Sequence, residues 1–259
     1  MIDIVSIIMP TYKCGLYIEE SVKSVQAQTY KNWELIIVDD CSGDDTVQRV
    51  SKLQEQDPRI KLFQNEKNSG AAVTRNKALR EAKGRWIAFL DSDDLWESTK
   101  LERQIKFMEK NGYAFSYHEY VEIDEQDNEL GVRVSGKEHV SKFDMFACCW
   151  PGCLSVMYDA SKIGLIQIND IKKNNDTAMW LKVIRKADCY LLPECLGKYR
   201  RRANSITPKP LWKRIWAHYP LFRVAEEMNP IAATFWVIMN VFGNAWKKYR
   251  YVKRYQPYE

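Results

Sequence analysis

Three aspartates gather within four positions at the end of an apolar segment. The stretch "RWIAFLDSDDLW", residues 85–96, predicts a buried strand that runs directly into Asp91, Asp93 and Asp94. Like charges this close together in a low dielectric cannot all stay ionised unless a positive group lies among them. Mg²⁺ and Mn²⁺ prefer oxygen ligands and are commonly held by one or two carboxylates plus substrate phosphates. The pattern therefore predicts a divalent metal at this strand end.

The elements that must position these acids alternate between strand and helix. Short apolar strands between helical periods indicate a mostly parallel sheet covered on both faces, a Rossmann-like α/β fold. Ligands of such sheets bind beyond the carboxyl ends of the strands, where Pro10, Tyr12 and the pair Asp39-Asp40 also lie. We expect strands at residues 3–12, 33–40, 60–66 and 85–91 and helices at residues 16–28, 44–56, 70–83 and 97–111.

The second half of the catalytic region has a looser pattern. It predicts a hairpin over residues 113–134, a strand at 153–159, a helix at 175–187 and a short strand at 189–193. This half would cover the nucleotide and hold the second substrate. We place a domain boundary in "NSITPKP" at residues 204–210, with a nucleotide-binding half at 1–112, an acceptor half at 113–208 and a basic, aromatic, helical region at 209–259.

Composition indicates a folded cytoplasmic protein. The chain has 46% hydrophobic and 28% charged residues, ordinary values for a globular protein. A strand pattern follows Met1 directly, without a basic start or a small-residue cleavage site, so we expect no secretory signal. Seven cysteines without CxxC pairs and three distant histidines argue against a zinc site or a disulfide framework. Cys148 and Cys149 either line the acceptor side or pack in the core.

The C-terminal region carries most of the positive charge. Residues 198–259 contain 13 Lys and Arg against three Glu, although the net charge of the whole chain is only +5. Acidic lipid, a phosphate-bearing acceptor and nucleic acid are the partner classes that such a charge attracts.

Two helices are predicted in this region. Trp212, Ile215, Trp216 and Tyr219 recur at helical spacing and indicate an amphipathic, basic, aromatic helix. Asn229 and Pro230 predict the N-cap and first residue of a second helix, whose apolar run at residues 231–246 would be about 24 Å long. This is shorter than the roughly 30 Å hydrocarbon core of a bilayer, which favours an interfacial helix over a spanning one. The alternative is that both helices pack on the catalytic domain as ordinary core.

Three segments carry a family resemblance. "VSIIMPTYKCGLYIEESVKSVQAQTYKNWELIIVDDCSGDDT", "NSGAAVTRNKALREAKGRWIAFLDSDDLW" and "NDTAMWLKVIRKADCYLLPECLGKYRRRANSIT" resemble, in order and over about 200 residues, the successive motifs of family 2 glycosyltransferases. The resemblance implies a GT-A fold and a metal-dependent, inverting transfer of a sugar from a nucleotide donor, typically a UDP-sugar. It implies a glycan or lipid-linked saccharide as acceptor in bacterial surface-polysaccharide synthesis, and no nucleic-acid partner. We therefore expect a cytoplasmic enzyme, peripheral at the anionic inner face of the cell membrane.

The resemblance also assigns roles on the nucleotide side. Asp40 matches the family position that hydrogen-bonds the base, with Asp39 beside it. Pro10 and Tyr12 match contacts of the first strand to that base, and Arg75 falls in a region near the nucleotide. Each assignment follows from the family motif and not from composition or spacing.

The resemblance assigns the chemical step as well. Asp91 matches an acid that reaches the ribose or the metal, Asp93 matches the acid that binds Mn²⁺ or Mg²⁺, and Asp176 matches the catalytic base. The sequence departs from the family in two places. Asn175 stands where an acid often precedes the base, and "RRANSIT" at residues 201–207 lacks a histidine that some members have.

Other interpretations of the same residues are open. The pair Asp39-Asp40 can stabilise a turn, Asp94 is expected to cap the helix near Glu97, and Asp176 can be an N-cap. An EF-hand starting at Asp91 is excluded, because Leu95 and Trp96 stand where an oxygen ligand and glycine are required. A phosphatase with an aspartyl nucleophile is a second enzyme class. A membrane-associated sugar-nucleotide sensor or inactive scaffold is a non-enzyme alternative, against which the retained acids argue.

Overall fold

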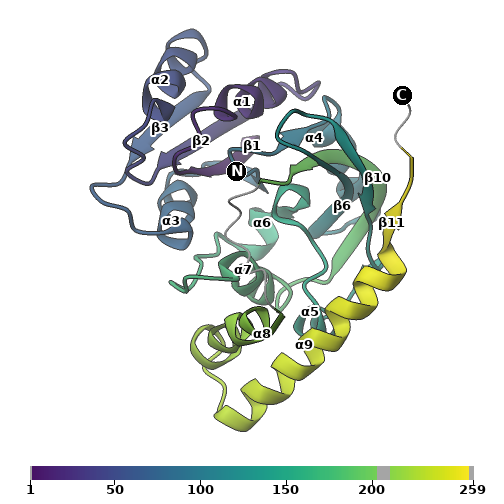
Figure 1. Ribbon diagram of the computed structural model, residues 1–259. Coiled ribbons are helices and arrows are strands. Elements are labelled where there is room, and N and C mark those ends of the chain that lie inside the picture. Colours follow the sequence, from purple (N-terminus) through teal and green to yellow (C-terminus); the bar gives the residue numbers. More distant parts are fainter. Residues whose placement is uncertain (1, 203–210, 257–259) are drawn as a thin grey trace.

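A parallel sheet forms the first half of the protein, as the sequence predicts. The computed structural model describes residues 2–202 and 211–256 (Figure 1). Strands β4, β1, β2 and β3 lie side by side in that order and all run parallel. Their bounds are β1 Ile2–Thr11, β2 Trp33–Asp39, β3 Ile60–Gln64 and β4 Gly84–Phe89, and the intervening helices are α1 Ile18–Gln26, α2 Thr46–Gln56, α3 Ala71–Glu81 and α4 Lys100–Asn111.

Helices cover both faces of this sheet because its strands are apolar on both sides. Every residue of β2 is buried. Ile7 of β1 packs in a core cluster with Val22 of α1 and Leu101 of α4. The next residue, Ile8, packs in a second cluster with Leu79 of α3. The alternation of strand side chains therefore places two separate cores, one on each side of the sheet.

The second half extends the same sheet. Strand β9 pairs with β4, and β6 pairs with β9. The described residues form an eleven-stranded sheet in total. The predicted hairpin is confirmed as β6 and β7, with the turn closed by the backbone N–H of Asp124 donating to the Asn128 carbonyl. The remaining elements are β5 Leu95–Trp96, β6 Phe115–Ile123, β7 Glu129–Val134, β8 His139–Val140, α5 Lys142–Ala147, a 3₁₀ turn Cys153–Ser155, β9 Met157–Asp159, α6 Ala160–Ile163, α7 Asn175–Val183 and β10 Cys189–Arg200.

Strand β10 is much longer than the strand expected at 189–193. It continues to Arg200, parallel to β6 and antiparallel to β5. The pairing register shifts between Leu192 and Cys195, so Pro193 lies at an irregularity where its missing N–H does not interrupt the ladder. The prediction was wrong because it treated this proline as the end of the strand.

The C-terminal residues return to the sheet. Helix α8 Leu211–Pro220 is followed by a π-helical turn Leu221–Ala225, helix α9 Pro230–Tyr251 and strand β11 Val252–Arg254. The N-cap prediction is confirmed, because Oδ1 of Asn229 accepts from the backbone N–H of Ala232 at 2.9 Å. Strand β11 pairs with β7, which the sequence did not predict. The predicted boundary at 204–210 lies outside the described residues, and the domain division stays a prediction.

The described residues contain neither a disulfide nor a helix that could span a membrane. All seven cysteines are free, which agrees with the expectation of no disulfide framework. Within residues 2–202 and 211–256, none of the helices combines the length and apolar character that crossing a bilayer requires.

Candidate functional site

The predicted site residues meet at the carboxyl edge of the parallel strands. Two hydrogen bonds donated by backbone N–H groups join the segments that follow β1 and β2. The N–H of Asp40 donates to the Thr11 carbonyl at 2.9 Å, and the N–H of Lys13 donates to Oγ of Ser42 at 2.9 Å. The segments that carry Tyr12 and Asp40 are therefore adjacent, as the sheet topology predicts.

Asp39 and Asp40 are both buried and both bind nearby loops. Asp39 accepts from the backbone N–H and from the hydroxyl of Ser42. These bonds stabilise the turn after β2, which is the role that the alternative interpretation gave to this acid. The carboxylate of Asp40 accepts from Nδ2 of Asn65 and from the backbone N–H groups of Ser69 and Gly70, each at 2.8 Å. A carboxylate has about four lone-pair sites, so Asp40 keeps accepting capacity for a base. Contact with a base stays a prediction for both acids.

The bonds to Asp40 also orient helix α3. Gly70 is the residue before this helix, and its φ of 86° lies in the left-handed region that favours glycine. Its N–H can then point at Asp40 while the helix begins at Ala71. Arg75 lies on the second turn of α3, so the position of its side chain depends on Asp40.

Arg75 links the two halves of the site. It is 7% exposed, and its guanidinium donates to Oδ1 of Asn175 at 2.7 Å and forms an ion pair with Asp91. Burial lowers the pKa of Arg75, but the charges of Asp91 and Asp176 outweigh burial and raise it. Arg75 is therefore a fixed cation between the strand-end acids and the start of α7.

The acids at the end of β4 differ in exposure. The side chains of Asp91 and Asp93 are 30% and 23% exposed, whereas Asp94 is 1% exposed. Burial, followed by the charge of Asp91, raises the pKa of Asp93. Burial, followed by the charge of Asp93, raises the pKa of Asp94 well above its ordinary value. The charge crowding inferred from the sequence is thus present in the fold.

Asp94 does not cap the following helix, so that prediction was wrong. Helix α4 begins later than expected, at Lys100, with Thr99 as its N-cap. Oδ1 of Asp94 instead accepts from the backbone N–H of Arg200 at 2.9 Å. The reason is that β10 runs past the "DSDD" segment and offers it a nearer backbone donor. Asp94 therefore attaches β10 to the site.

Two arginines, one at the end of β10 and one just after it, contact the acidic segment, and neither was predicted from the sequence. Nε of Arg200 donates to the backbone carbonyl of Asp93 at 2.9 Å, and its guanidinium is completely buried. Arg202 donates from Nη1 to Oδ2 of Asp93 at 2.9 Å. The only local signal was the run of three arginines at residues 200–202, which does not reveal a partner more than 100 positions earlier.

Asp176 lies in the first turn of α7 and is half-buried. It is not the N-cap, because that position belongs to Asn174, and Oδ1 of Asp176 accepts from the backbone N–H of Thr177 at 2.7 Å. The N-cap alternative for Asp176 was therefore wrong. Its role as the base stays a prediction. The neutral Asn175 fits its position, since its amide oxygen accepts from Arg75.

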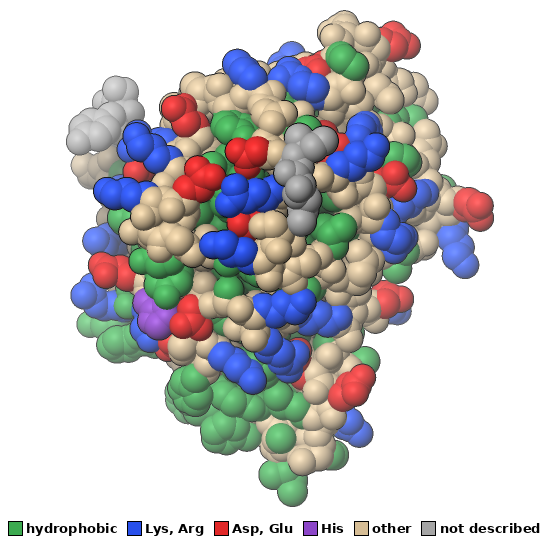
Figure 2. Space-filling view, turned by 180° about the vertical axis from the view of Figure 1, so that it is seen from behind, with side chains coloured by type: hydrophobic (Ala, Val, Ile, Leu, Met, Phe, Trp, Pro, Cys, Tyr) green, Lys and Arg blue, Asp and Glu red, His purple; other side chains and the backbone are tan. Residues whose placement is uncertain are grey.

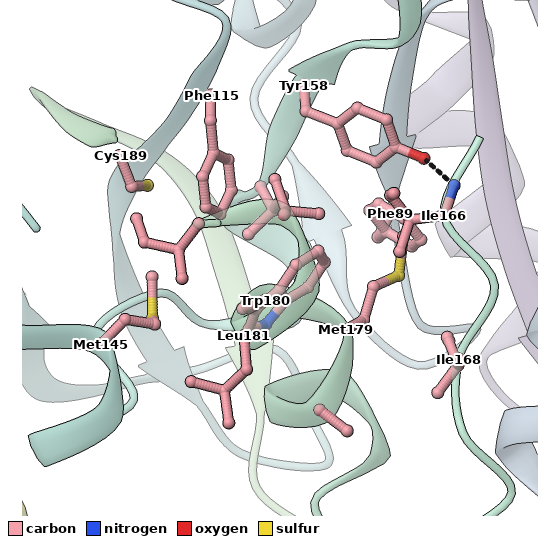
Figure 3. Packing of buried hydrophobic residues seen from close by; sticks show 14 of the residues in the cluster. Phe89, Phe115, Met145, Tyr158, Ile166, Ile168, Met179, Trp180, Leu181 and Cys189 are labelled. Carbon is pink, nitrogen blue, oxygen red and sulfur yellow. Dashed lines mark hydrogen bonds between the residues drawn. The ribbon is translucent and has the colours of Figure 1, made fainter. Parts of the chain in front are cut away.

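Aromatic packing fixes α7 against β4. Trp180 is completely buried, and its ring lies 5.1 Å from that of Phe89, edge to face (Figure 3). Figure 3 shows both side chains in one apolar cluster together with Phe115. Trp180 is one turn beyond Asp176, and Phe89 is two residues before Asp91. This contact therefore restrains the separation between the predicted base and the predicted metal acids.

Pro10 and Tyr12 lie at the edge of the site. Pro10 is half-buried, and Tyr12 is 44% exposed, with Nζ of the neighbouring Lys13 5.3 Å from its ring centroid. A cavity of about 300 Å³ lies beside Arg202 and is also lined by Lys13, Tyr17 and Asp44. None of the predicted site residues lines this cavity, so the contacts of Pro10 and Tyr12 to a base stay predictions.

The two adjacent cysteines take different positions. Cys148 is buried in the core, as the packing interpretation expected. Cys149 is half-buried; burial, followed by the charge of Asp176, raises the pKa of its thiol to about 12. Cys149 therefore lies within the electrostatic reach of the predicted base.

The chemistry of the strand-end acids fits a hard divalent cation. Asp91 and Asp93 offer only oxygen ligands, and Asp93 is partly desolvated beside a second carboxylate. Among the described residues, no three His, Cys, Asp or Glu side chains form a group that could hold a metal without help. Two carboxylates need further oxygens from a substrate, which is the usual arrangement where Mg²⁺ or Mn²⁺ binds with a phosphate.

Comparisons with known proteins agree with the resemblance. The model of the family described as "Glycosyl transferase family 2" matches residues 6–152. The chain is 39% identical over 246 residues to the putative teichuronic acid biosynthesis glycosyltransferase TuaG of Bacillus subtilis, covering 95% of this chain and 97% of TuaG. It is 38% identical over 239 residues to WfgD of Escherichia coli, a UDP-Glc:α-D-GlcNAc-diphosphoundecaprenol β-1,3-glucosyltransferase, covering 88% and 92% of the two chains.

Solved structures share the fold. The Staphylococcus aureus protein TarS (residues 1–349), solved in complex with UDP-GlcNAc, aligns with a TM-score of 0.71 at 19% identity, covering 95% of this chain and 74% of TarS. The mannosyltransferase PcManGT of Pyrobaculum calidifontis, in complex with GDP-Man and Mn²⁺, aligns with a TM-score of 0.63 at 18% identity, covering 95% and 71%. The GT-A expectation for the fold is confirmed.

Proposed function

Because the chain belongs to glycosyl transferase family 2, we propose that it transfers a sugar from a UDP-sugar to a hydroxyl of a lipid-linked saccharide, with inversion and with Mn²⁺ or Mg²⁺ bound. The UDP donor and the lipid-linked acceptor are supported by the name of the relative WfgD, which is 38% identical. Synthesis of a surface polysaccharide is supported by the relative TuaG.

The donor side consists of the residues at the strand ends. Asp40, with Asp39 beside it, binds the base, and Pro10 and Tyr12 form the surface on which the base lies. Asp93 and Asp91 would hold the cation, which when bound would stabilise negative charge on the leaving diphosphate. Arg75 holds Asp91 in place through its ion pair.

The acceptor side consists of the first turn of α7. Asp176 takes the proton of the acceptor hydroxyl as its oxygen attacks the anomeric carbon. The new bond forms on the face opposite the leaving group, the bond to the diphosphate oxygen breaks, and its electron pair leaves with UDP. A single displacement with one base inverts the configuration of the anomeric carbon.

The observation that carries this proposal is the bridge through Arg75. One buried guanidinium contacts Asp91 at the end of β4 and Asn175 at the start of α7. Its rigid fork of donors sets the relative position of both partners. A site for phosphate and metal and a site for a proton acceptor therefore have a common reference point, as direct transfer between two substrates requires.

A donor screen tests the proposed reaction. UDP-, GDP- and dTDP-sugars are incubated with the protein and with a diphosphate-lipid-linked GlcNAc acceptor, with Mn²⁺, with Mg²⁺ or with EDTA. We expect release of UDP and a new glycosidic product that EDTA abolishes. Hydrolysis of a phosphate ester without a nucleotide donor would favour the phosphatase. UDP-sugar binding without release of UDP under any of these conditions would favour the scaffold.

The proposed acceptor places the enzyme at a membrane surface. An undecaprenol carrier is confined to the bilayer, so a protein that reaches its diphosphate-linked sugar works at the lipid boundary. The basic C-terminal region supports an anionic surface, since lipid headgroups attract nearby Lys and Arg by about 1 kcal/mol each. We therefore propose a peripheral protein at the cytoplasmic face.

A further inference from the structure

Helix α9 presents a continuous apolar face to the outside of the protein. Six large hydrophobic residues recur at intervals of three or four positions over about 27 Å of helix, and we call them the outer face. Their exposed fractions are high throughout: Ile231 85%, Phe235 51%, Ile238 51%, Phe242 68%, Trp246 56% and Tyr249 83%. Monomeric soluble proteins rarely expose a contiguous apolar surface of this kind without a partner.

The opposite face of α9 is fixed on the domain. Ala233, Val237 and Asn240 are buried, and Nδ2 of Asn240 donates to the Phe146 carbonyl at 3.3 Å. Gly243 permits a close approach to α5, because a Cβ there would lie 2.2 Å from the Ala147 carbonyl oxygen. These contacts prevent the helix from turning, so the outer face stays exposed. The alternative that the C-terminal helices pack as ordinary core therefore holds for one face of α9 and not for its outer face.

Neighbouring aromatic residues widen the apolar surface. The ring of Trp236 lies 5.3 Å from that of Phe235 and 5.5 Å from that of Phe143, which is 58% exposed on α5. Figure 2 shows hydrophobic side chains gathered at the lower end of the molecule, the end at which α9 begins in Figure 1, with Lys and Arg side chains in a band above them.

We propose that the outer face of α9 is a membrane-docking surface that inserts into the headgroup boundary of an anionic bilayer. The positive charges on and after α9 favour an anionic bilayer over a second copy of the protein as the partner of this surface. Residues 228–258 contain five Lys and Arg and no Asp or Glu, and the exposed Lys248 and Arg250 adjoin the outer face. An anionic lipid supplies the missing negative charges. A second copy of residues 228–258 would bring five more positive charges and no Asp or Glu side chain.

The proposal rests on the lipid-linked acceptor of the proposed function, and the position of α9 supports it. Nζ of Lys247, on the last turns of α9, donates to the carbonyls of Cys149 at 3.0 Å and Trp150 at 2.6 Å. Cys149 lies within the electrostatic reach of Asp176. The loop that carries Cys149 and Trp150 therefore connects the docking helix with the surroundings of the predicted base.

The test uses the full-length chain and point substitutions, because residues after 208 contribute to the core and their deletion would disturb the fold. The outer-face variant is Ile238→Gln with Phe242→Gln. The matched control is Leu130→Gln with Leu165→Gln, two leucines that are each 45% exposed on other surfaces. A third variant, Lys248→Gln with Arg250→Gln, removes charge alone. Thermal unfolding and UDP binding in solution check that each variant is folded.

Co-sedimentation with vesicles gives the readout. We expect the unmodified protein and the leucine control to bind vesicles of 30% phosphatidylglycerol and 70% phosphatidylcholine, with binding at least tenfold weaker for the outer-face variant. The charge variant should bind these vesicles about as weakly as the unmodified protein binds pure phosphatidylcholine. Raising NaCl from 0.1 to 0.5 M should weaken binding without abolishing it, because salt screens the charges but not apolar insertion.

Two results would overturn docking. One is equal vesicle binding by the unmodified protein and the outer-face variant, or none by either. The other is a concentration-dependent dimer in analytical ultracentrifugation that only the outer-face variant loses, which would assign the surface to a second copy. The donor screen is separate, since release of UDP and product formation are measured without vesicles. Vesicle binding without any UDP-sugar turnover would refute the proposed reaction and leave the docking surface standing.

Discussion

At the scale of single residues, each acid of the candidate site has its own positive or amide partner. Asp91 pairs with Arg75, and Asp93 pairs with Arg202. A cation that binds Asp93 must therefore compete with or displace a guanidinium, and the phosphates of a donor are natural new partners for the released arginine. Metal and nucleotide are for this reason expected to bind together.

The first prediction concerns Asp93→Asn. We expect this variant to lose metal-dependent turnover by at least 100-fold and to bind nucleotide more weakly only when Mn²⁺ is present, because the amide removes a charged ligand. Titration calorimetry with UDP, with and without Mn²⁺, measures the effect. Asp170→Asn changes an exposed aspartate outside the site and serves as control. Near-normal activity of Asp93→Asn would remove Asp93 from the metal site.

The second prediction concerns Asp176→Asn. Nucleotide affinity should be unchanged while transfer falls at least 100-fold, because a base acts mainly in the transition state. Turnover with acceptor and UDP binding are measured on the same preparation. The asparagine keeps an oxygen that can accept from the N–H of Thr177, so the start of α7 should be preserved. Full transfer activity would leave Asp176 as a structural residue of the first helical turn.

At the scale of elements, a buried polar layer lies between helix α4 and strand β6. His118 of β6 is 1% exposed, and its Nδ1 contacts the Glu119 carbonyl at 2.7 Å. Lys100 of α4 is completely buried, with Nζ 3.9 Å from the ring centroid of Trp96. Burial, followed by the charge of Lys100, lowers the pKa of His118 from 6.5 to about 3.

The third prediction follows from this histidine. Between pH 6.5 and about 3, the unfolded chain binds a proton at His118 that the folded chain does not. The histidine therefore makes the free energy of unfolding fall by about 1.4 kcal/mol for each pH unit of acidification in that window. His118→Asn, which keeps a donor near Nδ1, should remove this contribution. Urea unfolding of both proteins at pH 7, 6 and 5 measures it.

The comparison with the unmodified protein isolates His118. Asp94 has a raised pKa, so its contribution has the opposite sign and is lost as the pH rises. This contribution is common to both proteins and cancels in the difference. Identical pH dependence of the two proteins would mean that His118 is protonated equally in the folded and unfolded chains.

At the scale of the whole molecule, side chains from the C-terminal region complete the hydrophobic core behind α7. Phe146 of α5 lies 5.3 Å from the ring of Trp236 in α9 and 6.3 Å from that of Phe222. Phe222 and Leu221 are completely buried in the same core as Trp180. The core behind α7 therefore depends on residues beyond 211.

The fourth prediction compares two truncations. A chain ending at residue 208 loses α8, α9 and β11, and we expect its free energy of unfolding to fall by at least about 3 kcal/mol, since each large apolar side chain that is uncovered costs roughly 1.5–3 kcal/mol. A chain ending at residue 251 loses the β11 pairing and the hydrogen bonds of Tyr255 to Gly131 and Glu129, and it should lose less stability. Urea unfolding orders the three chains. Equal stability of the 208-residue chain and the full chain would make the C-terminal region an independent appendage.

The sequence by itself determined the parallel half of the fold and the location of its acids. Strands such as β2 are apolar throughout, and the intervening helices have the period of 3.6, so local pattern is sufficient. The rule that ligands bind at the carboxyl ends of parallel strands then brought Asp40, Asp91 and Asp93 to one edge. The N-cap at Asn229 was also readable, because capping depends on neighbours within three residues.

Only the tertiary structure decided which groups meet across the chain. Arg75 reaches Asn175 across 100 positions, and Arg202 reaches Asp93 across 109, distances at which local pattern has no information. Helical period likewise shows which residues of α9 share a face, but the packing of the rest of the molecule determines whether that face is covered. Ala233 and Val237 pack against the domain, so Phe242 and Trp246 on the opposite face of α9 are exposed.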